Sequence, residues 1–210
     1  MATAKSRYIF RILHRDNVPW VLANGVTSRS HPDQNPHYVN IGNLDLIGKR
    51  AHRLVPIPPG GVLDDYLPFY FCTHSVMLFN IHTGRVEGVN CGQGDIVYLV
   101  SSIERLDEVG ARYVFTDRHA YVSNAHYFSD RADLTKLDWQ LIESRDFRRD
   151  PNDPGKLERR QAECLVHRGL PVDGLLGIAC QNDRTLEFCV GLVAAEGLHL
   201  KVLKRTDWYF

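Results

Sequence analysis

The sequence has no long hydrophobic run and no excess of either charge. No stretch of about 18 apolar residues occurs, so we expect no membrane span. Residues 1–8 lack the apolar core of a signal peptide, and we expect a cytoplasmic protein. The 25 Lys plus Arg equal the 25 Asp plus Glu, which argues against a protein that coats duplex DNA with a broad basic surface. A nucleic-acid enzyme with a short basic channel is compatible with this balance.

Common nucleotide, hydrolase and metal motifs are also absent. There is no Gly-x-Gly-x-x-Gly after a strand, no Gly-Lys-Ser/Thr, no Gly-x-Ser-x-Gly and no His-Glu-x-x-His. The five cysteines are odd in number and lack framework spacing, which favours reduced thiols. The pairs Cys72–His74 and Cys164–His167 lack the spacing of a zinc knuckle. We therefore expect no metal.

The sequence is otherwise that of an ordinary globular protein. A 44% hydrophobic composition supplies enough apolar material for a core. No repeat or linker divides the chain, so we expect a single domain over residues 1–210. Hydrophobic patterning predicts strands over Tyr8–Leu13, Leu67–Cys72, Ile96–Ser101, Tyr113–Thr116, Gln161–His167 and Leu198–Lys204. It predicts helices over Ile103–Val109, Leu134–Glu143 and Arg184–Glu196. This mixture without regular βαβ spacing indicates an α+β fold.

Turn and cap residues define three further segments. Asp16 is placed to cap a helix that Gly25 ends. The polar stretch Ser28–Gly61 predicts a ligand-covering loop with a short helix within Leu44–Arg53. Ser144–Arg160 is a charged loop with six basic and four acidic side chains, a net charge of only +2.

Four segments carry a family resemblance in their order and spacing. They are Tyr8–Asn17 (YIFRILHRDN), Lys49–Arg50 running into Val55–Phe71 (VPIPPGGVLDDYLPFYF), Val114–His119 (VFTDRH) and Arg159–Val166 (RRQAECLV). Together they resemble the DarT family, toxins that ADP-ribosylate DNA using NAD, and Asp207–Phe210 is similar to that family's C-terminus. The resemblance implies an ADP-ribosyltransferase-like fold, with a split, mainly antiparallel central sheet, flanking helices and NAD in a central cleft.

The same resemblance implies a reaction and partners. ADP-ribose would pass from NAD to a base, usually thymine, in single-stranded DNA in a sequence-dependent way, with release of nicotinamide. The natural partner would be a macrodomain antitoxin of the DarG type that removes the ADP-ribose. An enzyme of this fold that acts on RNA or protein, and a non-catalytic module that binds NAD or nucleic acid, are the alternatives. Nothing in the sequence requires more than a monomer.

Glu163 is the candidate catalytic acid. Cleavage of the nicotinamide–ribose bond develops positive charge on the ribose, as in glycoside hydrolysis. A carboxylate directed at the ribose stabilises that charge. Glu163 matches the family motif and lies within an apolar segment, Ala162–Val166, where an acid needs a role or a partner. The structural alternative is an ion pair with Arg160 or a place on a solvent-exposed face.

Arg50 matches the second functional residue of the family. The resemblance implies that this arginine accepts a proton from the target base. A guanidinium stays protonated at ordinary pH, so we expect it instead to bind NAD phosphates, polarise the base or stabilise its anion. Lys49 and Arg53 are neighbouring candidates for the same role, and a solvated basic loop is the alternative.

The resemblance also assigns an NAD platform to the first strand. Relatives commonly carry His-Ile-Thr where this chain has Arg11, Ile12 and Leu13. Backbone groups of these residues can still hold the nicotinamide amide, but a side-chain contact from the first position is changed. Trp20 and Ser28 match further NAD contacts, and Trp20 is equally suited to anchor the first helix in the core.

Four other residues complete the predicted site. The resemblance places Tyr70 against the nicotinamide, where stacking is physically reasonable, although it is equally suited to the core. His119 ends a predicted strand within a polar cluster and is a candidate contact to DNA or the reacting base. Arg148 and Arg149 lie in the charged loop that precedes Glu163, and arginines in such a loop suit a flexible single strand. An ordinary solvated loop is the alternative.

Overall fold

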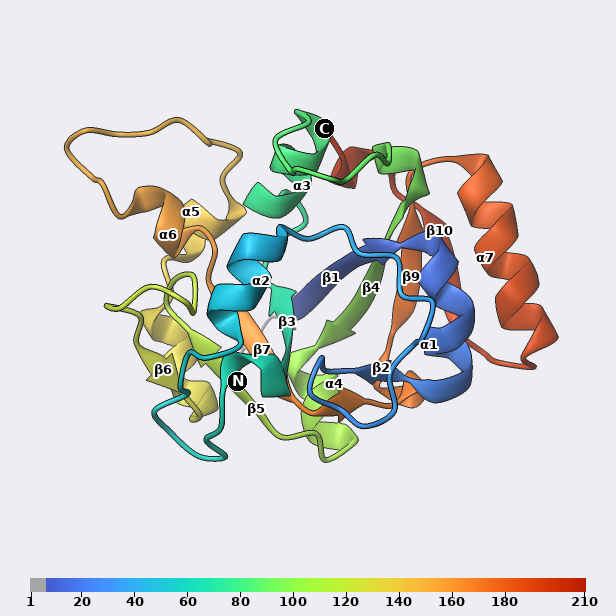
Figure 1. Cartoon of the computed structure of the whole chain (residues 1–210), viewed down its shortest axis with the longest axis horizontal. Helices are drawn as coiled ribbons and strands as arrows, with labels where there is room; N and C mark the ends of the chain where they lie inside the picture. The colour runs from blue at the N-terminus through green and yellow to red at the C-terminus, as the bar shows by residue number, and fades with distance from the viewer. Residues whose placement is uncertain (1–6) are drawn as a thin grey trace, which may run out of the picture.

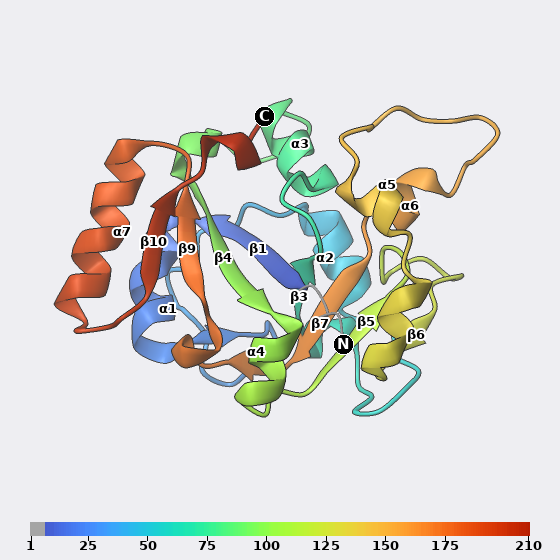
Figure 2. The same ribbon diagram turned by 180° about the vertical axis from the view of Figure 1, so that it is seen from behind.

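The computed structural model describes residues 7–210, which form a large mixed sheet with helices on both faces (Figure 1, Figure 2). The sheet has eight strands in the order β10-β9-β4-β1-β3-β7-β5-β6, all antiparallel to their neighbours except β10 and β9. Its strands are β1 (Tyr8–His14), β3 (Tyr66–Tyr70), β4 (Ile96–Ser102), β5 (Tyr113–Thr116), β6 (Tyr127–Phe128), β7 (Glu163–His167), β9 (Gly177–Cys180) and β10 (Lys201–Lys204). A second, small sheet pairs β2 (Val26–Thr27) with β8 (Gly169–Leu170).

Short helices surround the main sheet. They are α1 (Val18–Asn24), α2 (Leu44–Arg50), α3 (Val76–His82), α4 (Ile103–Glu108), α5 (Trp139–Glu143), α6 (Lys156–Arg159) and α7 (Asp183–Ala195). Helix α2 lies over the sheet on the face turned toward the viewer in Figure 1, and α4 lies on the face seen in Figure 2. Across residues 7–210, every helix is too short or too polar to span a bilayer.

The main sheet opens between β1 and β3. Strand β1 pairs with β4 along its whole length, from Tyr8 opposite Ser102 to His14 opposite Ile96. Its pairing with β3 consists of one register pair, Phe10 opposite Tyr70. The two strands therefore diverge on one side of that pair. The sequence prediction of an α+β fold with a split, mainly antiparallel sheet is confirmed.

The central strands are buried on both faces, which fixes their register. In β4, Val97 and Leu99 pack into one apolar cluster, whereas Ile96 and Tyr98 pack into another. All four side chains are at most 1% exposed. Because side chains alternate between the faces of a strand, a shift of one residue would exchange the two clusters.

The C-terminal segment belongs to the second of these clusters. The Tyr209 hydroxyl donates to the backbone carbonyls of Ile96 at 3.0 Å and Ala179 at 3.2 Å. The Tyr98 hydroxyl donates to the Trp208 carbonyl at 3.1 Å. The residues that resemble the family's C-terminus are therefore tied to β4 and β9.

Several predicted element boundaries are confirmed. Helix α1 ends at Gly25, whose φ is 78°. A Cβ there would lie 2.7 Å from the carbonyl oxygen of Leu170, so the position needs glycine for space as well as for its backbone angle. Helix α2 lies inside the predicted segment Leu44–Arg53, with Asn43 accepting the Leu46 N–H as its N-cap.

The prediction of one helix over Leu134–Glu143 is wrong. A 3-10 helix covers Arg131–Lys136, and α5 begins separately at Trp139. Asp138 separates them because its side chain accepts the Leu141 N–H at 3.1 Å. Asp138 adopts a non-helical backbone conformation that starts the new helix.

Other observed elements differ from the predicted ones or were not predicted. The segment Ser144–Arg160 contains the short helix α6, and the strand predicted from Gln161 begins at Glu163. Helix α3 was not predicted; Ser75 caps it through the Leu78 N–H. Strand β9 was also not predicted, because its four small or aliphatic residues form a strand through pairing with both β4 and β10.

Candidate active site

A cleft of about 490 Å³ lies where the sheet opens between β1 and β3. This volume is typical of small-molecule and cofactor sites. Residues 28–43 and helix α2 line its other sides. The structure brings all seven residues predicted to bind NAD to this cleft: Arg11, Ile12, Leu13, Trp20, Ser28, Arg50 and Tyr70.

Two buried polar atoms at the cleft are suited to a polar ligand. Among the residues that the structure describes, Trp20 Nε1 and Ser28 Oγ are buried without a hydrogen-bond partner. Buried polar groups are normally satisfied. A ligand with hydroxyl, phosphate or amide groups, such as NAD, would satisfy both.

Arg11 bridges the opening of the sheet. Its guanidinium donates to the Pro68 carbonyl on β3 at 3.0 Å, and the residue also lines the cleft. This is the one side-chain hydrogen bond of Arg11 within residues 7–210, and a guanidinium carries five N–H donors. Arginine at this position therefore holds β1 to β3 and keeps donors for a ligand.

Glu163 and Arg50 meet at the inner end of the cleft. Glu163 is the first residue of β7 and lies opposite Tyr70 on β3. Arg50, in the last turn of α2, donates to the two oxygens of the Glu163 carboxylate at 3.0 and 2.9 Å. This bidentate geometry is the strongest form of an arginine–carboxylate contact. The expected alternative, an ion pair between Glu163 and Arg160, is wrong.

The charge of Arg50 keeps Glu163 ionised. The Glu163 side chain is 1% exposed, and burial by itself would raise its pKa. The attraction of Arg50 outweighs burial and lowers the pKa of Glu163 below its usual value. The pKa of Arg50 is raised correspondingly, because the favourable interaction with Glu163 exceeds the effect of its burial.

His119 flanks the same carboxylate as a neutral imidazole. Its Nδ1 accepts the Tyr121 N–H at 3.2 Å, so the ring proton resides on Nε2, which lies 3.6 Å from a Glu163 oxygen. Burial lowers the pKa of His119, although Glu163 acts in the opposite direction. His119 also lines the cleft.

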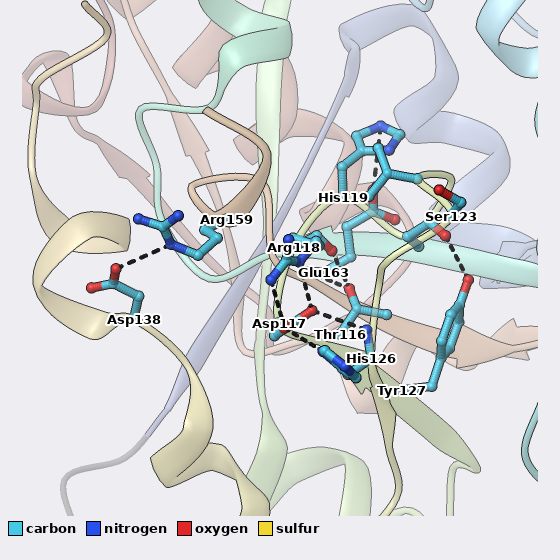
Figure 3. Close-up of polar contacts among 12 residues, drawn as sticks. Thr116, Asp117, Arg118, His119, Ser123, His126, Tyr127, Asp138, Arg159 and Glu163 are labelled. Atoms are coloured by element: carbon cyan, nitrogen blue, oxygen red, sulfur yellow. Dashed lines mark hydrogen bonds and ion pairs between the residues drawn. The ribbon is translucent and has the colours of Figure 1, made fainter. Parts of the chain in front are cut away.

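The loop that carries His119 is held by a polar cluster at the end of β5 (Figure 3). Thr116 Oγ1 accepts the Glu163 backbone N–H at 3.2 Å and donates to the Arg118 carbonyl at 2.6 Å. Asp117 accepts from Arg118 at 3.2 Å and contacts the His126 ring at 2.9 Å. These contacts fix the backbone on either side of His119.

Arg50 and His119 separate Glu163 from the cleft. Glu163 is fully buried, whereas the Arg50 side chain is 12% exposed and lines the cleft. A ligand in the cleft would therefore meet Arg50 and His119 before the carboxylate, and contact between such a ligand and Glu163 would require the Arg50 side chain to shift.

Arg148 and Arg149 lie away from this cleft. They belong to the segment between α5 and α6, which projects from the body of the molecule in Figure 1. The Arg148 side chain is 87% exposed and forms an ion pair with Asp146 at 2.8 Å. Arg149 is exposed. Their contact with DNA stays a prediction.

Gln161 is a cleft residue that the sequence reasoning did not select. It lines the cleft, and its side-chain amide donates to the Leu157 carbonyl at 2.9 Å. Its position two residues before Glu163 is the sequence feature that could have identified it as a site residue. Within residues 7–210, no three His, Cys, Asp or Glu side chains gather as a metal site would require.

Known proteins match this chain along nearly its whole length. The family described as "ssDNA thymidine ADP-ribosyltransferase, DarT" matches residues 10–210. The chain belongs to the DarT family. A DNA ADP-ribosyl transferase from Escherichia coli O127:H6 (strain E2348/69 / EPEC) is 42% identical over 202 residues, which cover 96% of this chain and 93% of that protein. One from Thermus sp. (strain 2.9) is 36% identical over 96% of this chain and 95% of that protein.

Solved structures of DarT agree with this family assignment. Thermus sp. 2.9 DarT in complex with ADP-ribosylated ssDNA superposes with a TM-score of 0.89 at 33% identity, over 100% of this chain and 99% of that chain. The same DarT in complex with NAD+ gives a TM-score of 0.87 at 33% identity, over 100% of both chains. The resemblance to this family that the four segments indicate is confirmed.

Proposed function

We propose that this chain transfers ADP-ribose from NAD to a thymine base in single-stranded DNA, in a sequence-dependent way and with release of nicotinamide. The observation that carries the proposal is the bidentate Arg50–Glu163 pair at the inner end of the cleft between β1 and β3. Membership of the DarT family supports it. NAD is a substrate here.

Glu163 acts as the catalytic carboxylate. Before the ribose enters, Arg50 lowers the pKa of Glu163, so the carboxylate carries a full negative charge at neutral pH. When the bond between nicotinamide and ribose breaks, positive charge develops on the ribose. A buried carboxylate directed at that ribose stabilises the charge more strongly than water would.

Arg50 connects the two substrates. Its side chain lies between Glu163 and the cleft, so the shift that admits the ribose brings the guanidinium toward the entering base. There it stabilises negative charge on the base as the base bonds to the ribose carbon, the nicotinamide–ribose bond breaks with release of neutral nicotinamide, and the proton of the base passes to solvent water. A guanidinium remains protonated throughout, which favours electrostatic stabilisation over proton abstraction.

The remaining cleft residues bind NAD. Tyr70 lies beside Glu163 on the neighbouring strand and offers a ring for the nicotinamide. The backbone of Ile12 and Leu13 holds the nicotinamide amide, and Trp20 and Ser28 supply their unpartnered donors. Holding the reacting atoms in line lowers the barrier by removing the entropy of encounter.

DNA binding is assigned to His119, Arg148 and Arg149. His119 lines the cleft beside Glu163 and contacts the reacting base. Arg148 and Arg149, on the projecting loop, bind the phosphates of the flanking nucleotides. A chain without net charge binds single-stranded DNA through such local groups, and its affinity falls as salt rises.

The cellular setting follows from the same assignment. We propose a toxin that acts in the cytoplasm as a monomer, with residues 1–210 as a single catalytic domain. Its partner is a macrodomain antitoxin of the DarG type that removes the ADP-ribose. Thermosipho africanus DarTG in complex with ADP-ribose has the same fold over 97% of this chain, with a TM-score of 0.75 at 18% identity.

Intact-mass analysis of an oligonucleotide tests the activity. A thymine-containing single strand is incubated with NAD and either the wild-type protein or the Glu163→Ala variant. Duplex DNA, RNA of the same sequence and a protein mixture serve as alternative acceptors. We expect a mass gain of one ADP-ribose on single-stranded DNA with the wild-type protein alone.

Three results would change the assignment. Labelling of RNA or protein in place of DNA would select another acceptor for the same fold. NAD binding with no turnover on any acceptor would indicate a non-catalytic module. Full transfer by Glu163→Ala would remove Glu163 from the mechanism.

A further inference from the structure

An aromatic cluster holds the base of the projecting loop 144–160. Phe147 stacks on Phe79 of α3, with ring centroids 5.3 Å apart and planes 11° from parallel. It also meets Phe210 edge-on, at 5.3 Å and 68°. The loop therefore leaves the body of the molecule with one of its own rings packed against α3 and the C-terminal segment.

Arg160, at the other end of this loop, completes the cluster. Its guanidinium carbon lies 4.0 Å from the centre of the Phe147 ring. Its N–H groups donate to the Leu141 carbonyl at 3.0 Å, the Ser144 hydroxyl at 3.0 Å and the His74 carbonyl at 3.1 Å. The residue thus joins both ends of the loop to α5 and to the turn before α3.

Arg160 is an unusual cation for a buried position. It is 2% exposed, and within residues 7–210 it forms no ion pair with a carboxylate. Burial of an unpaired charge is unfavourable, and burial lowers the pKa of Arg160. The position is occupied because a planar guanidinium donates to separate acceptors and stacks on a ring at the same time, which a lysine does not reproduce.

The cluster lies between the two functional parts of the chain. Arg148 and Arg149, the proposed DNA contacts, directly follow Phe147. Glu163 follows Arg160 by three residues and begins β7. The segment from Phe147 to Arg160 is therefore held to the body of the molecule at both ends. The position of Phe147 determines where Arg148 and Arg149 leave the body.

We infer that Phe79, Phe147, Arg160 and Phe210 form a loop clamp that positions loop 144–160 for DNA. Phe147 and Arg160 are positioning residues: they act through the loop and not on NAD. The inference rests on the proposed function, because it takes the loop as a contact surface for single-stranded DNA. The clamp is separate from the NAD cleft, since none of its four residues lines that cleft.

The test compares Phe147→Ala with two matched variants. Phe147→Tyr keeps a ring in the clamp, and Phe188→Ala removes an exposed ring from α7, which lies at the opposite edge of the sheet (Figure 1). Each variant is measured for its tryptic cleavage rate after Arg148 and Arg149, for kcat and KM toward a thymine-containing single strand, and for NAD affinity by calorimetry.

Loss of the Phe147 ring should free the loop without disturbing the cleft. We expect Phe147→Ala to be cleaved about tenfold faster and to raise the KM for DNA about tenfold, the size expected for lost aromatic packing. The affinity for NAD and the behaviour of Phe147→Tyr and Phe188→Ala should match the wild type. Arg160→Lys should change cleavage and the KM for DNA in the same direction as Phe147→Ala.

Three results would overturn the clamp. They are cleavage of Phe147→Ala at the wild-type rate, faster cleavage with an unchanged KM for DNA, and an equal loss of NAD affinity, which would indicate a general structural role. A wild-type protein that never labels DNA would instead overturn the proposed function. In that case the cleavage and calorimetry measurements still decide whether the clamp orders the loop.

Discussion

Replacement of Arg50 by alanine should convert Glu163 from a paired carboxylate into an isolated buried one. The variant removes two charge-assisted hydrogen bonds, at 3.0 and 2.9 Å, from a side chain that is 1% exposed. Breaking a buried ion pair in this way costs about 3–5 kcal/mol of stability. The burial that Arg50 now offsets would then dominate, and the pKa of Glu163 would rise above its usual value.

Protonation sets an upper limit on this loss. Each pH unit corresponds to about 1.36 kcal/mol for a single group, and an unfolded glutamate has a pKa of about 4.3. Protonating Glu163 in the folded state at pH 7 therefore costs about 4 kcal/mol. If an ionised, unpaired Glu163 would cost more than this, the side chain becomes protonated instead, so the loss of stability stays near this value. The expected destabilisation at pH 7 is about 3–4 kcal/mol, or roughly 6–16 °C in Tm for a domain of this size.

The stability difference between the wild type and Arg50→Ala should depend on pH in a defined direction. In the wild type the lowered pKa of Glu163 contributes stability above the unfolded pKa, and this contribution is lost as pH falls. In Arg50→Ala the raised pKa makes the variant lose stability as pH rises from about 4 toward the folded pKa. The gap between the two proteins should therefore shrink to about 1 kcal/mol at pH 5.

Urea unfolding at pH 5 and pH 7 measures this gap. The double variant Arg50→Ala/Glu163→Gln is the control, because a neutral side chain at position 163 removes the buried charge and should restore most of the stability lost at pH 7. A loss below about 1 kcal/mol at pH 7, a gap that widens on acidification, or no recovery in the double variant would refute the argument.

Three other predictions concern activity. Glu163→Gln should lower kcat for transfer by about 10²–10³-fold, which is the effect of removing one electrostatic stabiliser. Calorimetry should show that NAD binding is retained, and near-normal turnover would contradict the catalytic assignment. Tyr70→Phe should keep the KM for NAD whereas Tyr70→Ala should raise it about five- to tenfold through lost stacking, and equal KM values in the two variants would exclude stacking. Arg149→Ala should weaken DNA binding more than Arg148→Ala, because Arg148 is already paired with Asp146, and each lost phosphate contact should lower the slope of log affinity against log salt by about 0.7. Salt titrations of fluorescent single strands would measure this, and identical slopes in all proteins would argue against phosphate contacts at the loop.

Local sequence determined much of the fold. Short runs of apolar and β-forming residues identified β1, β4 and β5, because strands that are buried on both faces read as nearly continuous apolar segments. Gly25 marked the end of α1 because only glycine satisfies both its backbone angle and the contact with Leu170. By contrast, β9 has no pattern of its own and is a strand only through pairing with β4 and β10.

For the candidate site too, the sequence determined one part and the tertiary structure the other. The sequence by itself selected Arg50, Tyr70 and Glu163, since the segments around them identify the DarT family without any structure, although it missed Gln161. It did not determine how they interact. Glu163 had Arg160 as a nearby partner in sequence, and only the tertiary structure showed that Arg50, 113 residues away, forms the pair instead.

The physical reason is that composition and periodicity report each segment's own preferences, whereas an ion pair depends on which segments the sheet brings together. The opening between β1 and β3 places α2 against the first residue of β7, and so pairs Arg50 with Glu163. Arg160 is left to donate to backbone carbonyls and to stack on Phe147. Sequence determined the family and the chemistry available to this protein, and the tertiary structure decided which charge lies next to which.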